Sequence, residues 1–230
     1  QTASIEGICG GGPNCRPGEI SLAHNGILFL DEAAEFRSSV LQMLRVPMES
    51  HTITLCRAGR STCYPANFQL IMATNPCPCG NYGAKERICL CSAKSVQQYW
   101  NKFSGPLLDR IQIMVHIQDD EKTETVNLAE LKEHIRTAFE IQRKNGAYNS
   151  SLTPYELSER AKLDKDALDI LDKWLTEHDV GERRGSNILK VALTIANIDG
   201  REIVSKRDVL EAISYSKILD WQHIEEECHV

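Results

Sequence analysis

The chain has 230 residues, of which 42% are hydrophobic and 25% charged, and its formal net charge at pH 7 is −6. This composition is typical of a folded globular protein and excludes a disordered chain, a collagen and a coiled-coil rod. No apolar run approaches the roughly 20 residues of a membrane span, and no basic-then-apolar signal segment begins the chain. These observations favour a cytoplasmic protein with no membrane partner.

Charge and cysteine are distributed unevenly along the chain. Residues 1–118 contain 10 lysines and arginines against 8 acidic residues, a net charge of +2, whereas residues 119–230 contain 16 against 24, a net charge of −8. Eight of the nine cysteines lie in the first 91 residues. We therefore expect two domains with different roles, joined near Asp119 and Asp120.

The first segment predicts an α/β unit. Residues 27–30 form a continuous apolar run, which is typical of a strand buried on both faces of a parallel sheet. Residues 68–73 and 111–117 predict two further strands of this kind, and residues 32–49 predict a helix between the first two.

A β-hairpin is predicted between the helix and the second strand. Residues 52–55 and 61–64 are rich in β-forming side chains and flank the sequence Arg57-Ala58-Gly59-Arg60, with Gly59 at the tip. Its two cations are suited to contacts with nucleic-acid phosphates. An ordinary exposed basic turn is the alternative interpretation.

The second segment predicts helices throughout. The apolar spacing from Leu128 indicates a first helix that stops near Gly146, and a second helix ends near Gly181. A third is expected over residues 188–198, and a fourth is capped by Ser205 and runs to about residue 219.

Two carboxylates follow the first predicted strand. Asp31 and Glu32 stand directly after residues 27–30, at the end of a strand where open α/β sheets hold their ligands. In a nucleoside triphosphatase the first acid orients Mg²⁺, usually through water, and the second polarises the attacking water. The alternative is an ordinary strand that runs into a helix N-terminus.

Two more polar side chains occur in the order that such a site needs. Asn75 follows the strand at 68–73 and places an amide at the same sheet edge, and Arg110 ends a helical stretch before residues 111–117. A neighbouring subunit of a ring ATPase supplies such an arginine to the γ-phosphate. Taken singly, Asn75 also suits a turn, and Arg110 suits a surface pair with Asp109.

Several long stretches resemble one family. Residues 17–32, 75–80 and 104–110, together with 188–192 and 194–196 in the helical segment, are similar to the magnesium-chelatase-like AAA+ proteins of bacteria, the competence proteins of the ComM and YifB type. The resemblance covers nearly the whole chain. It implies an α/β fold class.

The resemblance also divides the chain. Residues 1–118 would be the C-terminal part of an AAA+ ATPase domain, a partial parallel sheet with helices and a β-hairpin. Residues 119–230 would be an all-α lid of the magnesium-chelatase C-terminal type.

The function implied by the resemblance is an ATP-driven hexameric DNA helicase. Such a homo-oligomer promotes branch migration on single-stranded or branched DNA in natural transformation and recombination, with ATP and Mg²⁺ as cofactors. Asp31 and Glu32 match the Walker B acids, with Mg²⁺ held by Asp31 through water. Asn75 matches sensor 1, and Arg110 matches the arginine finger.

The resemblance implies roles for further residues, and the chain differs from the family at two positions. The hairpin of Arg57 and Arg60 falls where the family has its pre-sensor-1 hairpin, which faces the central pore in related helicases. Arg183, or else Arg184, fits the sensor-2 position that contacts nucleotide. The residues at two other places where the family usually has arginines are Asn187 and Leu193.

The phosphate-binding loop is missing from the sequence. No Gly-x-x-x-x-Gly-Lys-Ser/Thr occurs, and the glycines at 10–12 are not followed by a lysine. In the family this loop lies upstream of the residue numbered Gln1. We therefore expect a fragment cut inside its ATPase domain, inactive by itself, with a gap or repaired sheet between the strands at 68–73 and 111–117.

Four cysteines form two Cys-x-Cys pairs separated by nine residues, namely Cys77, Cys79, Cys89 and Cys91. Four thiolates at this spacing suit a tetrahedral, structural Zn²⁺ site. Free buried thiols and oxidation-prone pairs are the alternatives, although a cytosolic location argues against stable disulfides.

Two other functions stay open. The same fold serves as the ATPase subunit of a metal chelatase that inserts Mg²⁺ into a porphyrin, although such subunits typically lack the cysteines near residues 75–80. A non-catalytic module that mediates oligomerisation or partner binding is the third possibility.

Overall fold

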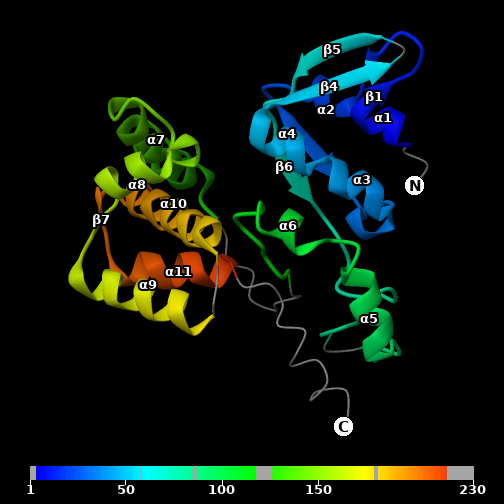
Figure 1. The fold of residues 1–230 in the computed structure, drawn as a ribbon. Helices are drawn as coiled ribbons and strands as arrows, with labels where there is room; N and C mark the ends of the chain where they lie inside the picture. Colours follow the sequence, from blue (N-terminus) through cyan, green and yellow to red (C-terminus); the bar gives the residue numbers. More distant parts are fainter. Residues whose placement is uncertain (1–3, 58, 85–86, 118–125, 179–180, 217–230) are drawn as a thin grey trace. The chain divides into compact units, whose positions relative to one another are not determined.

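The computed structural model describes residues 4–57, 59–84, 87–117, 126–178 and 181–216 (Figure 1). These residues form two compact units, which divide between Arg110 and Ile111. The domain boundary expected near Asp119 and Asp120 lies outside the described residues. Within the described ranges, none of the helices combines the length and apolar character that a membrane crossing needs.

The first unit alternates short strands and helices (Figure 1). In chain order its elements are α1 (Ile5–Cys9), β1 (Gly10–Gly11), β2 (Arg16–Pro17), α2 (Glu19–Leu22), β3 (Ile27–Leu30), the 3₁₀ turn η1 (Ala33–Glu35), α3 (Ser38–Met43), α4 (Arg45–Ser50), β4 (Thr52–Arg57), β5 (Arg60–Pro65), β6 (Gln69–Met72), α5 (Ala93–Trp100) and α6 (Gly105–Leu108). The mixed α/β class expected from the sequence is confirmed.

Strands β3 and β6 pair in parallel, with Leu28 opposite Leu70. Leu28 and Leu30 are buried in the core of the unit, whereas Ile27 and Phe29 are 59% and 57% exposed. The prediction that this strand is buried on both faces is therefore wrong. Alternate side chains of a strand point to opposite faces, so Leu28 and Leu30 share one face and Ile27 and Phe29 share the other. Only the face of Leu28 and Leu30 packs into the core of the unit.

Residues 111–117 form no strand, contrary to the prediction. Among the described residues β6 is hydrogen-bonded to β3 alone, and no strand lies along its other edge. A strand needs a neighbour to satisfy its backbone N–H and C=O groups, and none of the described strands pairs with this segment. The Met114 N–H instead donates to the Tyr215 carbonyl oxygen over 2.9 Å.

The helix predicted over residues 32–49 is divided into η1, α3 and α4. The division at Leu44 comes shortly before Pro47, which lies in the first turn of α4, where a missing N–H is tolerated. Val40, Leu41 and Leu44 are fully or almost fully buried and anchor these short helices in the core of the first unit.

The predicted β-hairpin is confirmed. β4 and β5 are antiparallel with Arg57 opposite Arg60, so that two residues form the loop. Gly59 has a φ of +78°. Two-residue hairpin loops need such left-handed positions, which glycine adopts without a steric cost.

The second unit is mainly helical (Figure 1). Its elements are α7 (Leu128–Lys144), the 3₁₀ turn η2 (Asn149–Ser151), α8 (Pro154–Arg160), β7 (Lys162–Leu163), α9 (Lys165–Glu177), α10 (Glu182–Ile198), β8 (Ile203–Val204) and α11 (Lys206–Ser216). Helix α10 packs against α7 and α11, and α11 packs against α9. The four predicted helices are present, but α8 and the short parallel pair β7–β8 were not predicted.

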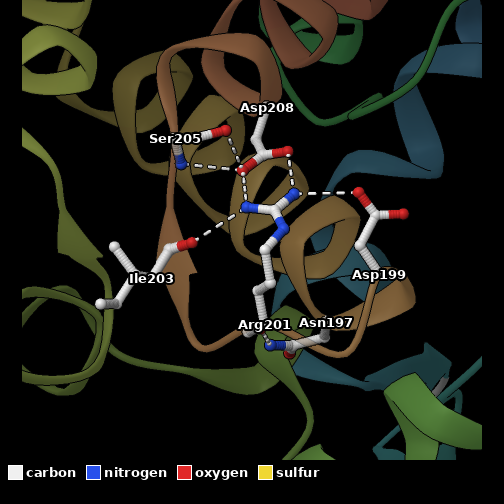
Figure 2. A network of polar contacts seen from close by, with 6 residues as sticks. All are labelled: Asn197, Asp199, Arg201, Ile203, Ser205 and Asp208. Atoms are coloured by element: carbon white, nitrogen blue, oxygen red, sulfur yellow. Dashed lines mark hydrogen bonds and ion pairs between the residues drawn. The ribbon is translucent and has the colours of Figure 1, made fainter.

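A charged network joins α10 to α11 (Figure 2). Arg201 donates from Nη1 to Asp208 Oδ2 over 2.8 Å and from Nη2 to Asp208 Oδ1 over 2.7 Å. Ser205 donates to the same carboxylate from its N–H and its hydroxyl, each over 2.8 Å. Asp208 is fully buried, and a buried carboxylate needs partners of this kind.

Candidate functional site

Asp31 and Glu32 follow β3 directly, and both side chains are exposed. The Glu32 N–H donates to Asp31 Oδ1 over 3.0 Å. Glu32 itself has a left-handed backbone, with φ 48° and ψ 46°, which costs a residue other than glycine roughly 1–2 kcal/mol. Strain of this kind clusters at functional sites, and here it falls on the second acid of the candidate pair.

Hydrogen bonds beyond the β3–β6 register hold the carboxyl ends of the two strands together. The Ala73 N–H donates to the Leu30 carbonyl over 2.9 Å, and the Ala33 N–H donates to the Ala73 carbonyl over 2.8 Å. Asn75 follows two residues later and is exposed. The structure therefore brings the two carboxylates and the amide to one edge of the sheet, while their roles toward nucleotide stay predictions.

Arg110 lies just after α6, and its side chain is only 13% exposed. Its Nη2 lies 2.7 Å from Glu49 Oε1, at the C-terminal end of α4, and its Nη1 donates to the Pro106 carbonyl oxygen. The guanidinium thus has an ion-pair partner within its own unit, Glu49, which is not the Asp109 considered from the sequence. No local pattern in the sequence points to Glu49 as this partner.

Arg57 lies at the end of β4 beside the hairpin loop and is exposed, with its Nη1 3.9 Å from Glu6 Oε1. This separation and the exposure of both side chains make the contact a weak one. The first residue of β5, across from it, is Arg60. The hairpin therefore carries two arginine positions at its tip.

Arg183 and Arg184 lie in the first turn of α10, which begins after Gly181. Arg183 is exposed and Arg184 is half-buried. Cations at a helix N-terminus oppose the helix dipole, and an anion bound there would offset the repulsion. The two arginines belong to the second unit, and their relation to the sheet edge stays a prediction.

The four cysteines converge. One sulfur from each of Cys77, Cys79, Cys89 and Cys91 lies within 4.8 Å of all the others. Cys77 is fully buried, whereas Cys79 is exposed. Among the described residues these four form the one group of metal-ligating side chains with this geometry.

The thiols of the cluster differ in acidity. A hydrogen bond from the Asn81 backbone, followed by one from Cys77, lowers the pKa of Cys79 to about 6. Burial raises the pKa of Cys89 to about 12 and also raises the pKa of Cys91. Because the thiolate is the form that binds metals, Cys79 is the most readily available ligand.

Two aromatic residues at the end of α5 contact the segment that carries Asn75. The Tyr99 hydroxyl lies 2.9 Å from Thr74 Oγ1. Trp100 donates from Nε1 to the Pro76 carbonyl oxygen over 2.9 Å. Sequence reasoning missed both, because aromatic residues on an amphipathic helix are typical of any core.

Comparisons with known proteins agree with the fold. Residues 1–125 match the family model described as magnesium chelatase, subunit ChlI, and residues 125–216 match the model of its C-terminal part. The first match alone covers more than half of the chain.

Relatives of known sequence cover nearly the whole chain. It is 38% identical over 226 residues to the competence protein ComM of Haemophilus influenzae, which covers 93% of this chain and 43% of that protein. It is 37% identical over 225 residues to the uncharacterized protein YifB of Escherichia coli, 94% of this chain and 44% of that protein. A more distant relative is the DNA replication licensing factor mcm7 of Xenopus tropicalis, 24% identical over 87% of this chain and 29% of that protein.

Proposed function

The chain belongs to the magnesium chelatase subunit ChlI family, and from this membership we propose that it is part of an AAA+ ATPase that acts on DNA. The chain spans less than half the length of two curated relatives, 44% of YifB of Escherichia coli and 43% of ComM of Haemophilus influenzae. The activity is therefore proposed for the whole protein, in which these residues supply one edge of the nucleotide site.

The observation that carries the proposal is the pairing of β3 with β6, which brings Asp31, Glu32 and Asn75 to one sheet edge. Exposed carboxylates are the oxygen ligands that Mg²⁺ accepts, and this fits Asp31 as the acid that holds the ion through water. Bound Mg²⁺ would neutralise charge on the phosphates of ATP.

The chain's own groups then have separate roles. Glu32 accepts hydrogen bonds from the attacking water and orients it, as the acid next to a metal-holding aspartate does in nucleoside triphosphatases. The Asn75 amide donates to the water or to the γ-phosphate. The bond between the Glu32 N–H and Asp31 Oδ1 couples the orientations of the two acids.

Glu32→Gln in the full-length protein tests the proposal. The amide keeps the size of the side chain but removes the charge, so ATP should still bind while hydrolysis falls by at least about a hundredfold. Glu35→Gln in the adjacent η1 turn is the matched control and should leave hydrolysis unchanged. Undiminished hydrolysis in Glu32→Gln would overturn the assignment of Glu32.

DNA is the proposed substrate. Two relatives are named for competence and for DNA replication. The hairpin supports this proposal, because Arg57 is exposed beside the loop and Arg60 stands opposite it in the strand register, which would suit phosphate contacts on single-stranded or branched DNA. In this proposal the protein is a helicase that uses ATP to drive branch migration.

A ring of identical subunits, six in number, is the proposed assembly. Arg110 would serve as the arginine finger of a neighbouring site, and Arg183 or Arg184 would contact the nucleotide from the lid. The finger role requires that the contact of Arg110 with Glu49 open or rearrange when the subunits assemble.

A metal chelatase is the second candidate function, favoured by the name of the family whose models match the chain. The same sheet edge would then hydrolyse ATP without DNA. The effect of DNA on the rate of ATP hydrolysis decides between the two functions. A rate that rises with DNA would favour the helicase, and a rate that is unchanged by DNA but rises with a porphyrin-binding partner would favour the chelatase.

A further inference from the structure

We propose that Cys77, Cys79, Cys89 and Cys91 bind one Zn²⁺ ion, and that this metal site holds residues 74–76 in place through α5. The four sulfurs lie within 4.8 Å of one another. Three of the separations are 3.4, 3.6 and 3.6 Å. Tetrahedral Zn²⁺ with Zn–S bonds of about 2.3 Å sets its sulfurs about 3.8 Å apart, close to these distances.

The spacing distinguishes a single ion from other uses of four cysteines. A disulfide needs two sulfurs about 2.05 Å apart. Cys77 instead lies 3.4 Å from Cys79 and 3.6 Å from Cys89, and all four thiols are free. In an iron–sulfur cluster the four thiolates are divided among two or four iron atoms, so their sulfurs do not all surround one point. A compact set of four sulfurs around one point favours Zn²⁺, with no position left for catalysis.

The cysteines are connected directly to α5. Cys91 is followed by Ser92, whose hydroxyl accepts the Ser95 N–H over 3.2 Å and caps the helix. Val96, one turn into the helix, is buried together with Cys77 in a small apolar cluster. The start of α5 is therefore fixed by the same loop that carries the metal ligands.

The end of α5 returns to the segment ahead of the cysteines. Tyr99 contacts Thr74, and Trp100 donates to Pro76, so that both neighbours of Asn75 are held by one helix. Each contact is 2.9 Å long. A change in the position of α5 would thus be transmitted to the Thr74 side chain and to the Pro76 backbone, on either side of Asn75.

A turn within the cysteine loop contacts Asn75 more directly. The Gly80 N–H donates to the Cys77 carbonyl over 3.0 Å, and Gly80 has a φ of +78°. A Cβ placed on Gly80 would lie 3.9 Å from Cγ of Asn75. The side chain of Asn75 therefore lies beside the turn that the metal would close.

These contacts give the metal a positioning role. Zn²⁺ would fix the described residues around its ligands, 77–84 and 87–91. These would fix both the Gly80 turn and α5, which would hold the amide of Asn75 at the sheet edge. The benefit to nucleotide sensing rests on the proposed function, but the metal site and its mechanical connection do not.

Metal analysis of the full-length protein, purified reduced and without chelators, tests the site. We expect about one zinc per chain in the wild type and its loss in Cys79→Ser and Cys91→Ser. Cys63→Ser, at an exposed cysteine of β5, is the matched control and should keep the metal. The proposal would be overturned if the thiols of Cys77, Cys79, Cys89 and Cys91 were reactive in wild-type protein that contains no zinc. Iron bound instead of zinc would also overturn it.

Hydrogen exchange tests the connection between the metal site and residues 74–76. It uses the wild-type protein, so the result does not depend on whether a cysteine variant folds. Zinc is removed from the folded wild type with a thiol reagent, and the thiols are then restored and reloaded with Zn²⁺ alone. Removal should speed exchange in peptides 69–76 and 93–101 by about tenfold or more, and reloading should reverse it. A peptide within α10 serves as the internal control.

The outcomes separate the parts of the proposal. Zinc binding with unchanged exchange in both peptides would overturn the connection to Asn75. Faster exchange in α10 as well would indicate general unfolding and would also overturn it. Because neither readout involves nucleotide or DNA, a negative result here is distinct from a failure of the proposed ATPase function.

Discussion

The guanidinium of Arg110 and the carboxylate of Glu49 form a close ion pair, with Nη2 and Oε1 2.7 Å apart. The pair joins Arg110, the second residue after α6, to the end of α4. Arg110 is largely shielded from solvent and Glu49 is 43% exposed, so the pair is reached by water from one side. The ion pair fixes the orientation of the Arg110 guanidinium. The contact with Glu49 must therefore break before Arg110 can bind a phosphate elsewhere.

Mixed rings of inactive subunits test where Arg110 acts. Arg110→Ala and Glu32→Gln should each abolish hydrolysis in uniform rings of the full-length protein. Their mixture should regain part of the activity, because an intact Arg110 on one subunit completes a neighbouring site that has an intact Glu32. The measurement is steady-state ATP hydrolysis against mixing ratio. A mixture as inactive as its components would place Arg110 at its own subunit's site.

The hairpin arginines should set the salt dependence of DNA binding. In the double variant Arg57→Ala and Arg60→Ala, the affinity should fall and the slope of log K against log salt should become shallower by about 1 to 2. Arg37→Ala, an exposed arginine outside the hairpin, is the control. Fluorescence anisotropy with labelled single-stranded DNA at several salt concentrations gives the slopes, and an unchanged slope would exclude the hairpin as a phosphate contact.

Asp208 should be important for the stability of the helical unit. Asp208→Asn removes the charge opposite Arg201 and presents amide hydrogens to groups that already donate, so the free energy of unfolding should fall by about 2–4 kcal/mol. Asp199→Asn, at an exposed partner of the same guanidinium, should cost less than about 1 kcal/mol. Urea unfolding followed by circular dichroism compares them, and equal losses would contradict this account.

The same carboxylate should make the unit sensitive to acid. Burial raises the pKa of Asp208, but hydrogen bonds from Arg201 and Ser205 outweigh burial and hold the pKa below its usual value. The unfolded chain therefore binds the proton more readily, and the stabilisation is present above about pH 4 and lost as the pH falls further. The free energy of unfolding should decline with acid less steeply in Asp208→Asn than in the wild type.

A close approach of two backbone segments should make any side chain at position 18 destabilising. A Cβ on Gly18 would lie 2.2 Å from the backbone nitrogen of Gly10 and 2.6 Å from the Ile8 carbonyl oxygen. Gly18→Ala must displace the backbone of α1 and β1, at a cost of about 1–3 kcal/mol. Gly105→Ala, with no atom within 4 Å of its Cβ, is the control. Equal unfolding temperatures for the two variants would contradict the close backbone approach at Gly18.

Local patterns were sufficient to predict much of this fold. The four apolar residues of β3, the hairpin around Gly59 and the helix periods after Leu128 each carry their information within a short window, and each element is present. The sheet edge of Asp31 and Asn75 followed from one rule, that the carboxyl ends of parallel strands share an edge.

Other features depend on contacts that no local pattern encodes. Residues 111–117 have the apolar content of a strand, yet strand formation depends on a neighbour that the described residues do not provide. The ion pair of Arg110 joins positions 61 residues apart, and the contacts of Tyr99 and Trp100 reach back across the cysteine loop. Tertiary partners of this kind are set by packing, and sequence spacing alone does not reveal them.

The one-sided burial of β3 has a consequence for the substitutions that the strand accepts. Leu28 and Leu30 fill the core, so truncation to alanine would open cavities costing about 2–5 kcal/mol in the stability of the unit. Ile27 and Phe29 project from the opposite face, where more than half of each residue is exposed and polar replacements disturb less packing within this unit. Four adjacent positions that look equivalent in sequence would therefore tolerate mutation alternately, with a period of two.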